Sequence, residues 1–178
     1  YGALTVTDDL SLDLHQDELL AVIGPNGAGK TTLINQLSGQ LRPDAGRVVL
    51  AGRDISDQSM AQRVHLGMAR TFQITSILPG FSVLENVALA VQARSGSSFR
   101  FFRAAAGQRR LNDAAMAHLA EVDLDADAQR RAADLSHGKQ RQLELAIALA
   151  TDPHILLLDE PLAGTGGAEA ARLVALMQ

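Results

Sequence analysis

The sequence contains no cysteine and no excess of basic residues. The lack of cysteine excludes a disulfide framework and a thiolate metal site, and it suits a reducing compartment. The formal net charge of −4 gives no support to a dominant nucleic-acid role, which usually shows a basic excess. One basic run, residues 100–110, fits contact with lipid head groups, nucleic acid or an acidic partner, although a solvated helix start is the simpler interpretation.

Long apolar runs are also lacking. The longest cover residues 19–23, 143–150 and 155–158, whereas a membrane-spanning helix needs roughly 20 apolar residues. The opening YGALTVTDD lacks the charged-then-apolar order of a signal peptide. These features predict a soluble, cytoplasmic chain. The initial Tyr1 and the helical pattern that continues to the last residue indicate a fragment of a longer protein.

The apolar periodicity predicts alternating strands and helices in the first part of the chain. Alternating leucines over residues 10–14 predict a half-buried strand, and the run over 18–24 predicts a buried parallel strand that leads into a glycine-rich loop. A helix follows and ends at Gly39. Further strands are expected over 47–52 and 68–72. A short helix is expected over 59–67, with Ser59 or Asp57 as its cap.

The middle of the chain has a different character. Residues 82–96 and 111–124 are both helical in pattern, with apolar side chains at i, i+3 and i+4 and no strand between them. The strand pattern returns over 154–161, where a run of apolar residues ends in two acids and a proline. The pattern therefore predicts an α/β protein that is interrupted by a helical insert.

The glycine-rich loop has the sequence GPNGAGKTT and fits the pattern G-x-x-x-x-G-K-[ST] between a strand and a helix. Its glycines let successive N–H groups point at phosphate oxygens. Lys30 supplies a positive charge between the β- and γ-phosphates, and the Thr31 hydroxyl is a ligand suited to Mg²⁺. The residues expected to bind the nucleotide here are Gly24, Asn26, Gly27, Ala28, Gly29, Lys30, Thr31 and Thr32.

The acids that end the later strand, in LLLDE, complete such a site chemically. Asp159 is expected to hold Mg²⁺, and Glu160 is expected to polarise the attacking water as a general base. A GTPase would share both parts, but its usual Asn-Lys-x-Asp motif does not occur. A small-molecule kinase also fits these two parts, but it does not explain a second polar helix start, LSHGKQ, at residues 135–140.

With GPNGAGKTT upstream, the stretch LSHGKQRQLELAIALATDPHILLLDEP resembles the nucleotide-binding subunit of an ATP-binding cassette (ABC) transporter. The family signature is LSGGQ. Leu135, Ser136 and Gly138 match it, whereas His137 and Lys139 depart from it. The resemblance implies a P-loop NTPase (RecA-like) core sheet with an inserted all-helical subdomain and an N-terminal antiparallel β region. The core would comprise residues 1–73 and 134–178, and the helical subdomain residues 74–133.

The resemblance also explains why one chain would have two anion-binding helix starts. In this family two cassettes dimerise head to tail, and each ATP lies between the glycine-rich loop of one subunit and the signature helix of the other. Ser136 and Gly138 would then contact the partner's ATP, with Mg²⁺ as the second cofactor. Ser136 also fits an ordinary helix N-cap.

Three further family features fall on this chain. Gln73, in RTFQ, matches the glutamine that contacts Mg²⁺ or the water, and Tyr1 stands where an aromatic ring stacks on adenine. The segment after Glu160 departs from the family pattern at Thr165. The family's switch histidine would lie beyond residue 178, so we expect the chain as given to bind ATP and to hydrolyse it poorly.

RTFQ, the insert, LSHG and DEPLAG together resemble the ATPases of branched-chain amino-acid importers and of related urea or amide importers. The implied partners are a second ATPase subunit, identical or different, permease subunits that meet residues 74–87, and a periplasmic or extracellular binding protein acting through the permease. No nucleic acid is expected. The implied location is the cytoplasmic face of the inner membrane. The alternatives are a non-transport cassette ATPase in DNA repair or at the ribosome, and a regulatory module that binds ATP without turnover.

Overall fold

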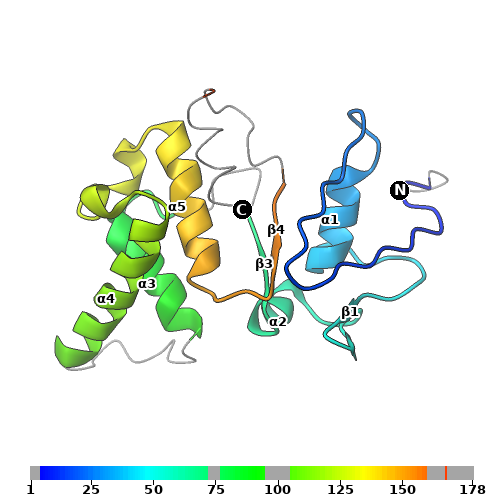
Figure 1. The fold of residues 1–178 in the computed structure, drawn as a ribbon, viewed down its shortest axis with the longest axis horizontal. Helices are drawn as coiled ribbons and strands as arrows, with labels where there is room; N and C mark the ends of the chain where they lie inside the picture. The colour runs from blue at the N-terminus through cyan, green and yellow to red at the C-terminus, as the bar shows by residue number, and fades with distance from the viewer. Residues whose placement is uncertain (1–4, 72–76, 95–104, 160–166, 168–178) are drawn as a thin grey trace. The chain divides into compact units, whose positions relative to one another are not determined.

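The structure is a computed structural model that describes residues 5–71, 77–94, 105–159 and 167. The chain divides into two units, Tyr1–Arg63 and Val64–Gln178. Each unit has its own secondary structure, and each is described separately below (Figure 1).

The first unit is built around helix α1 (Lys30–Ser38), which follows the glycine-rich loop. The helix ends as predicted at Gly39, whose φ of 80° lies in the left-handed region that glycine adopts without strain. The amides of Gly39 and Gln40 return to the carbonyls of Gln36 and Asn35 at 3.3 and 2.9 Å. These bonds satisfy carbonyl groups at the helix end that have no partner within the helix.

A short antiparallel hairpin and the first residues of a short helix complete this unit. Strands β1 (Val49–Leu50) and β2 (Arg53–Asp54) are joined by Ala51 and Gly52, both with positive φ, as the favoured two-residue hairpin turn requires. Helix α2 (Met60–His65) begins after Ser59. Ser59 and Gln62 each bond the other's backbone N–H, at 2.8 and 3.4 Å, so Ser59 is the cap. Asp57 instead pairs with Arg42.

The predicted strands over 10–14 and 18–24 do not form within the described residues. Leu19 and Ile23, expected to be buried, are 71% and 90% exposed. The apolar pattern led to the prediction of buried strands, but a strand also needs a neighbour for its backbone N–H and C=O groups. No described residue of the first unit pairs with either segment. The predictions of a half-buried strand over 10–14 and of a buried strand over 18–24 are therefore wrong.

In the second unit, strands β3 (Met68–Arg70) and β4 (Ile155–Leu157) form within the predicted ranges 68–72 and 154–161, and the structure shows that they pair in parallel. Met68 lies opposite Ile155 in the register. The two strands can begin close together because the residue before β3 is Gly67, which has a φ of 94° and lies against His154. A Cβ at position 67 would be only 2.4 Å from Cδ2 of the His154 ring. The pairing places Arg70 and Asp159 near the same end of the two strands.

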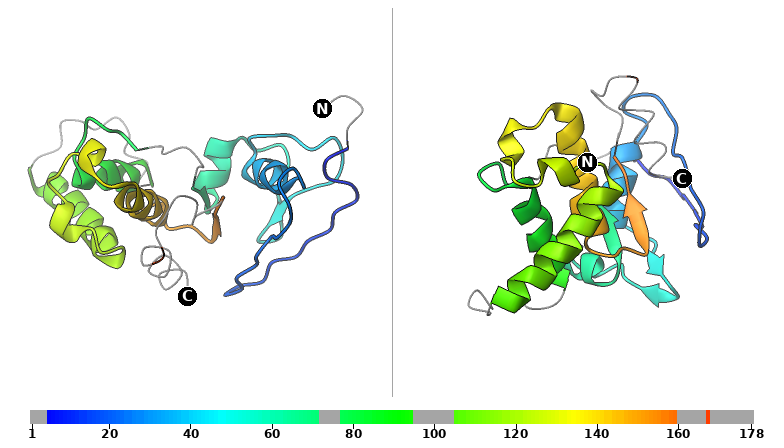
Figure 2. Two further views of the ribbon diagram at one scale, coloured as in Figure 1. Left: turned by 90° about the horizontal axis from the view of Figure 1, so that it is seen from above. Right: turned by 60° about the vertical axis from the view of Figure 1, so that its left-hand side comes forward.

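The other layer of this unit is helical. Helices α3 (Val83–Arg94), α4 (Ala105–Glu121) and α5 (His137–Leu149) pack together with the short 3₁₀ turns η1 (Asp125–Asp127) and η2 (Ala132–Asp134) (Figures 1 and 2). Their shared core contains fully buried residues from each helix, spaced about one turn apart. These include Val83, Val87, Ala115, Leu119, Leu143 and Ala146.

The bounds of helix α4 differ from the predicted ones. It begins at Ala105, before the expected residue 111, and ends at Glu121 rather than at residue 124. The stop is local: Asp123 has a φ of 57°, and the Leu124 amide returns to the Leu119 carbonyl at 2.9 Å. Among the described residues, no helix is both long and apolar enough to cross a membrane.

Candidate nucleotide-binding site

The glycine-rich loop forms a tight turn that leads directly into α1. Gly27 and Gly29 have φ values of 82° and 91°, which only glycine adopts without strain. Gly29 is the residue before the helix, and no side chain caps this end. The amides of Lys30, Thr31 and Thr32 have no carbonyl partner one turn earlier, so they are available to an anion at the positive end of the helix.

The Lys30 side chain folds back and contacts the start of this loop. Its Nζ donates to the carbonyls of Gly24 at 2.6 Å and Pro25 at 2.9 Å. The ammonium therefore lies beside the start of the loop while its backbone begins the helix at the other end. Thr31 is exposed, so its hydroxyl is accessible. A positive charge, a set of amides and a free hydroxyl form the donor set that a polyphosphate and its magnesium ion need.

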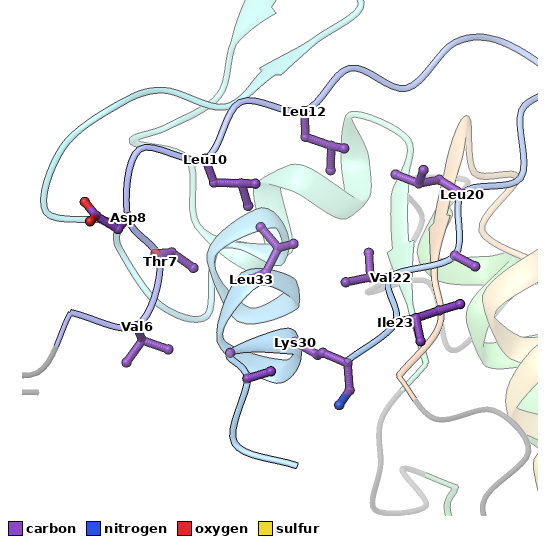
Figure 3. A pocket seen from close by; sticks show the side chains of 13 residues that line it. Val6, Thr7, Asp8, Leu10, Leu12, Leu20, Val22, Ile23, Lys30 and Leu33 are labelled. Atoms are coloured by element: carbon purple, nitrogen blue, oxygen red, sulfur yellow. The ribbon is translucent and has the colours of Figure 1, made fainter. Parts of the chain in front are cut away.

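An apolar groove of about 400 Å³ adjoins the loop (Figure 3). Leu10, Leu12, Leu20 and Val22 surround Leu33 of α1, and Lys30 lies at one end of the group. On the same side the Val6 carbonyl lies 3.0 Å from where a Cβ at Gly29 would be. A larger residue at position 29 would therefore collide with the 5–8 segment as well as strain the backbone.

Arg63 fixes the opposite end of α1. Its side chain is 1% exposed, and it donates to the carbonyls of Gln36, Leu37, Ser56 and Gln58 at 2.6–3.0 Å. Two of these carbonyls belong to the last turn of α1, where a cation also compensates the negative end of the helix. Burial lowers the pKa of Arg63 from its usual range.

Arg63 is a residue that sequence reasoning missed. It was one polar position in a short expected helix, and nothing in the local pattern indicates that its partners lie up to 27 residues away. The only sequence sign was Gly39. A Cβ there would lie 2.8 Å from Arg63 Nε, so Gly39 both ends the helix and leaves space for the guanidinium.

The signature stretch forms the start of helix α5, at the position where a second helix start was predicted. Ser136 is the N-cap of α5, and its hydroxyl accepts from the Lys139 amide at 3.4 Å. Ser136 and His137 are exposed, whereas Gly138 is buried. The predicted cap is therefore confirmed, and the end of a 13-residue helix faces solvent with a hydroxyl at its tip.

Asp159 follows β4 and is almost fully buried, with 3% of its surface exposed. Its Oδ2 pairs with Nη2 of Arg70, at the end of β3, at 3.2 Å. The guanidinium thus compensates the buried carboxylate. Within the described ranges no group of three or more acidic or histidine side chains could hold a metal ion. A carboxylate such as Asp159, or a hydroxyl such as that of Thr31 in the other unit, is by itself the kind of oxygen donor that Mg²⁺ uses together with phosphates and water.

Three of the predicted site residues, Tyr1, Gln73 and Glu160, lie outside the described residues, as does Thr165. Their roles stay predictions. The described positions divide between the two units: the glycine-rich loop belongs to the first, and Ser136, Gly138 and Asp159 belong to the second.

Solved structures define the class of protein. A crystal structure of MJ1267, an ATP-binding cassette of an ABC transporter, matches with a TM-score of 0.84 and 29% identity, covering 99% of this chain and 71% of that one. The fold is therefore that of an ABC-type cassette, an α/β P-loop NTPase, as the motifs predicted.

Sequence comparisons show the family. The ABC transporter family model matches residues 7–163. The high-affinity branched-chain amino acid transport ATP-binding protein LivG of Salmonella typhimurium is 35% identical over 97% of this chain and 70% of that protein. The lipoprotein-releasing system ATP-binding protein LolD of Chromohalobacter salexigens is 36% identical over 98% and 70%. The chain belongs to the ABC transporter family, and it is an ATPase subunit of a transporter.

Proposed function

We propose that this chain binds Mg·ATP and that two copies form a head-to-tail dimer around it. The observation that carries the proposal is the presence of two helix starts suited to anions in one chain. One follows a glycine-rich loop with an ammonium and an exposed Thr31, and the other is capped by an exposed Ser136. A nucleotide bound to its own subunit needs only the first, so the second is suited to the nucleotide of a partner.

Within each site the residues have separate tasks. The amides of residues 27–32 and Lys30 would hold the phosphates. By family resemblance, Thr31, Asp159 and Gln73 would hold Mg²⁺. When bound, Mg²⁺ neutralises phosphate charge. Glu160 takes a proton from the attacking water, and Tyr1 stacks on adenine. Ser136 and Gly138 meet the γ-phosphate of the partner's ATP.

We further propose that the dimer powers an importer of branched-chain amino acids or related small amides, at the cytoplasmic face of the membrane. The likeness to LivG supports this substrate class, whereas the likeness to LolD supports release of lipoproteins instead. The subunit does not touch the transported molecule, so its fold does not select between them. Reconstitution with the cognate permease and binding protein distinguishes them: leucine should stimulate ATP hydrolysis.

The loop before α3 is the proposed contact with the permease. Leu78 and Phe81 are 44% and 45% exposed in this loop. The buried Asn86 fixes the loop by accepting from the Leu78 amide at 2.8 Å and donating to the carbonyls of Leu78 and Ser82 at 3.1 and 2.9 Å. Two apolar side chains on a rigid loop provide a surface suited to another protein.

Replacing Glu160 by glutamine tests the catalytic part of this proposal. Because glutamine keeps the shape of the side chain but accepts no proton, hydrolysis should fall about 100-fold or more in the complete polypeptide. Phosphate release measures the turnover, and light scattering measures the mass. The variant should accumulate as an ATP-bound dimer, whereas hydrolysis at the unsubstituted rate would remove Glu160 from the mechanism.

A further inference from the structure

The chain has only two lysines, and each stands at one of the two proposed phosphate sites. Lys30 is in the glycine-rich loop, and Lys139 is in the first turn of α5, where the family signature has glutamine. A lysine in the first turn of a helix is unfavourable because the helix dipole is positive there. The position of Lys139 therefore needs a compensating anion.

The structure supplies that anion within the second unit. Lys139 Nζ donates to Oδ2 of Asp127 at 2.5 Å, and Arg130 Nη1 donates to Oδ1 of the same carboxylate at 2.7 Å. The Asp127 side chain is only 9% exposed. Arg130 also donates to the Asp134 carbonyl at 2.8 Å, which joins the turns η1 and η2.

The carboxylate is held firmly as an anion. The hydrogen bond from Lys139 is the main cause that lowers the pKa of Asp127, with a further contribution from Arg130, whereas burial acts in the opposite direction. The pair therefore joins two segments of the chain that are 12 residues apart. One is η1 in the helical region, and the other is the first turn of the signature helix.

The ion pair also fixes the residues that face a phosphate. The backbone amide of Lys139 donates to the Ser136 hydroxyl, so one residue contacts the cap through its amide and η1 through its side chain. A movement of the first turn of α5 would have to break the charge-assisted contact with Asp127. The Lys139 ammonium is already bound to Asp127, which belongs to η1. The direction of the Lys139 side chain is therefore set by its contact with η1.

We propose that Lys139 is a positioning residue: through its ion pair with Asp127 it holds the first turn of α5 so that Ser136 and Gly138 meet the phosphate of a nucleotide bound to the second copy. This inference rests on the proposed function. The two lysines then have different tasks, because Lys30 contacts phosphate and Lys139 orients the donors that do so.

Four variants of the complete polypeptide test this inference in a Glu160→Gln background: Lys139→Met, Asp127→Asn, the double variant, and Lys139→Arg. Each of the first two should raise the ATP concentration for half-maximal dimerisation about fivefold, because each removes the ion pair between Lys139 and Asp127, a contact worth about 1 kcal/mol. The double variant should be no worse than either, and Lys139→Arg should retain most of the dimerisation. Arg94→Met, which breaks the exposed pair with Asp152, serves as the control and should change nothing.

Two further readouts separate positioning from a purely structural role. Binding of a fluorescent ATP analogue to the monomer should stay unchanged in all variants, because it reports the loop at Lys30. Circular dichroism should show an intact fold, since Arg130 still compensates Asp127 in Lys139→Met. Unchanged dimerisation in Lys139→Met would overturn the inference. So would a loss in Lys139→Met with none in Asp127→Asn, which would show that the ammonium contacts phosphate directly.

Failure of the proposed function gives a different result. If the Glu160→Gln parent itself stays monomeric in saturating Mg·ATP, the head-to-tail dimer is wrong, and the positioning role of Lys139 falls with it. If the parent dimerises and the Lys139 and Asp127 variants dimerise equally well, only the positioning role is wrong.

Discussion

Lys30→Ala should weaken ATP binding at least about 100-fold. The side chain supplies a formal positive charge to a site that otherwise consists of amides and hydroxyls. Charged hydrogen bonds contribute about 1.5–3 kcal/mol each, and a factor of 100 corresponds to about 2.8 kcal/mol. Titration with a fluorescent ATP analogue measures the affinity directly.

The same substitution removes the bonds from Nζ to the carbonyls of Gly24 and Pro25, so the loop itself needs to be checked. Because these carbonyls belong to a turn that is only partly buried, water can replace the ammonium, and the melting temperature should change by only a few degrees. Arg53→Met removes an exposed cation from β2 of the same unit and is the matched control. ATP affinity that is as high in Lys30→Ala as in Arg53→Met would remove Lys30 from phosphate binding.

Arg63→Met should produce the largest loss of stability in the first unit. Methionine fills similar space but leaves four carbonyl groups that bond the guanidinium without that donor. Buried polar groups left unsatisfied cost about 1–3 kcal/mol each, and we expect a total loss of about 3–5 kcal/mol after partial hydration. Since domains are stable by only about 5–15 kcal/mol, this is a large fraction.

Urea unfolding measures this change, with Arg53→Met expected within about 0.5 kcal/mol of the parent. Arg63→Lys should lie between them, because an ammonium has three donors and cannot match the planar guanidinium. ATP affinity should fall in Arg63→Met as α1 loses its fixed end. Equal urea midpoints for Arg63→Met and Arg53→Met would contradict the role of Arg63.

The sequence predicted those elements whose signals are local. The glycine-rich loop, the stop at Gly39 and the cap at Ser136 depend on residues adjacent in the chain, and all were found. Strands were also found within the ranges predicted for β3 and β4, whereas their parallel pairing was not predicted. The helical insert followed from periodicity alone, as the core formed by Val87, Leu119 and their neighbours shows.

The remaining features depend on partners distant in sequence. The run over 18–24 has the apolar composition of a buried strand, yet strand formation depends on a neighbour that composition does not specify. Likewise nothing local shows that Arg63 bonds the end of α1, or that Arg70 pairs with Asp159 across 89 residues. Lys139 was visible as a departure from LSGGQ, but its partner Asp127 was not. Tyr1, Gln73 and Glu160 stay predictions.

The central claim is that ATP joins two copies, with the loop of one opposite the signature helix of the other. Residues 1–178 contain no cysteine, so cysteines introduced at Asn26 and His137 would be the only thiols among them. In the Glu160→Gln background, oxidation should give a disulfide-linked dimer in saturating Mg·ATP and almost none without nucleotide. Monomers under both conditions, or equal cross-linking with and without ATP, would contradict the claim.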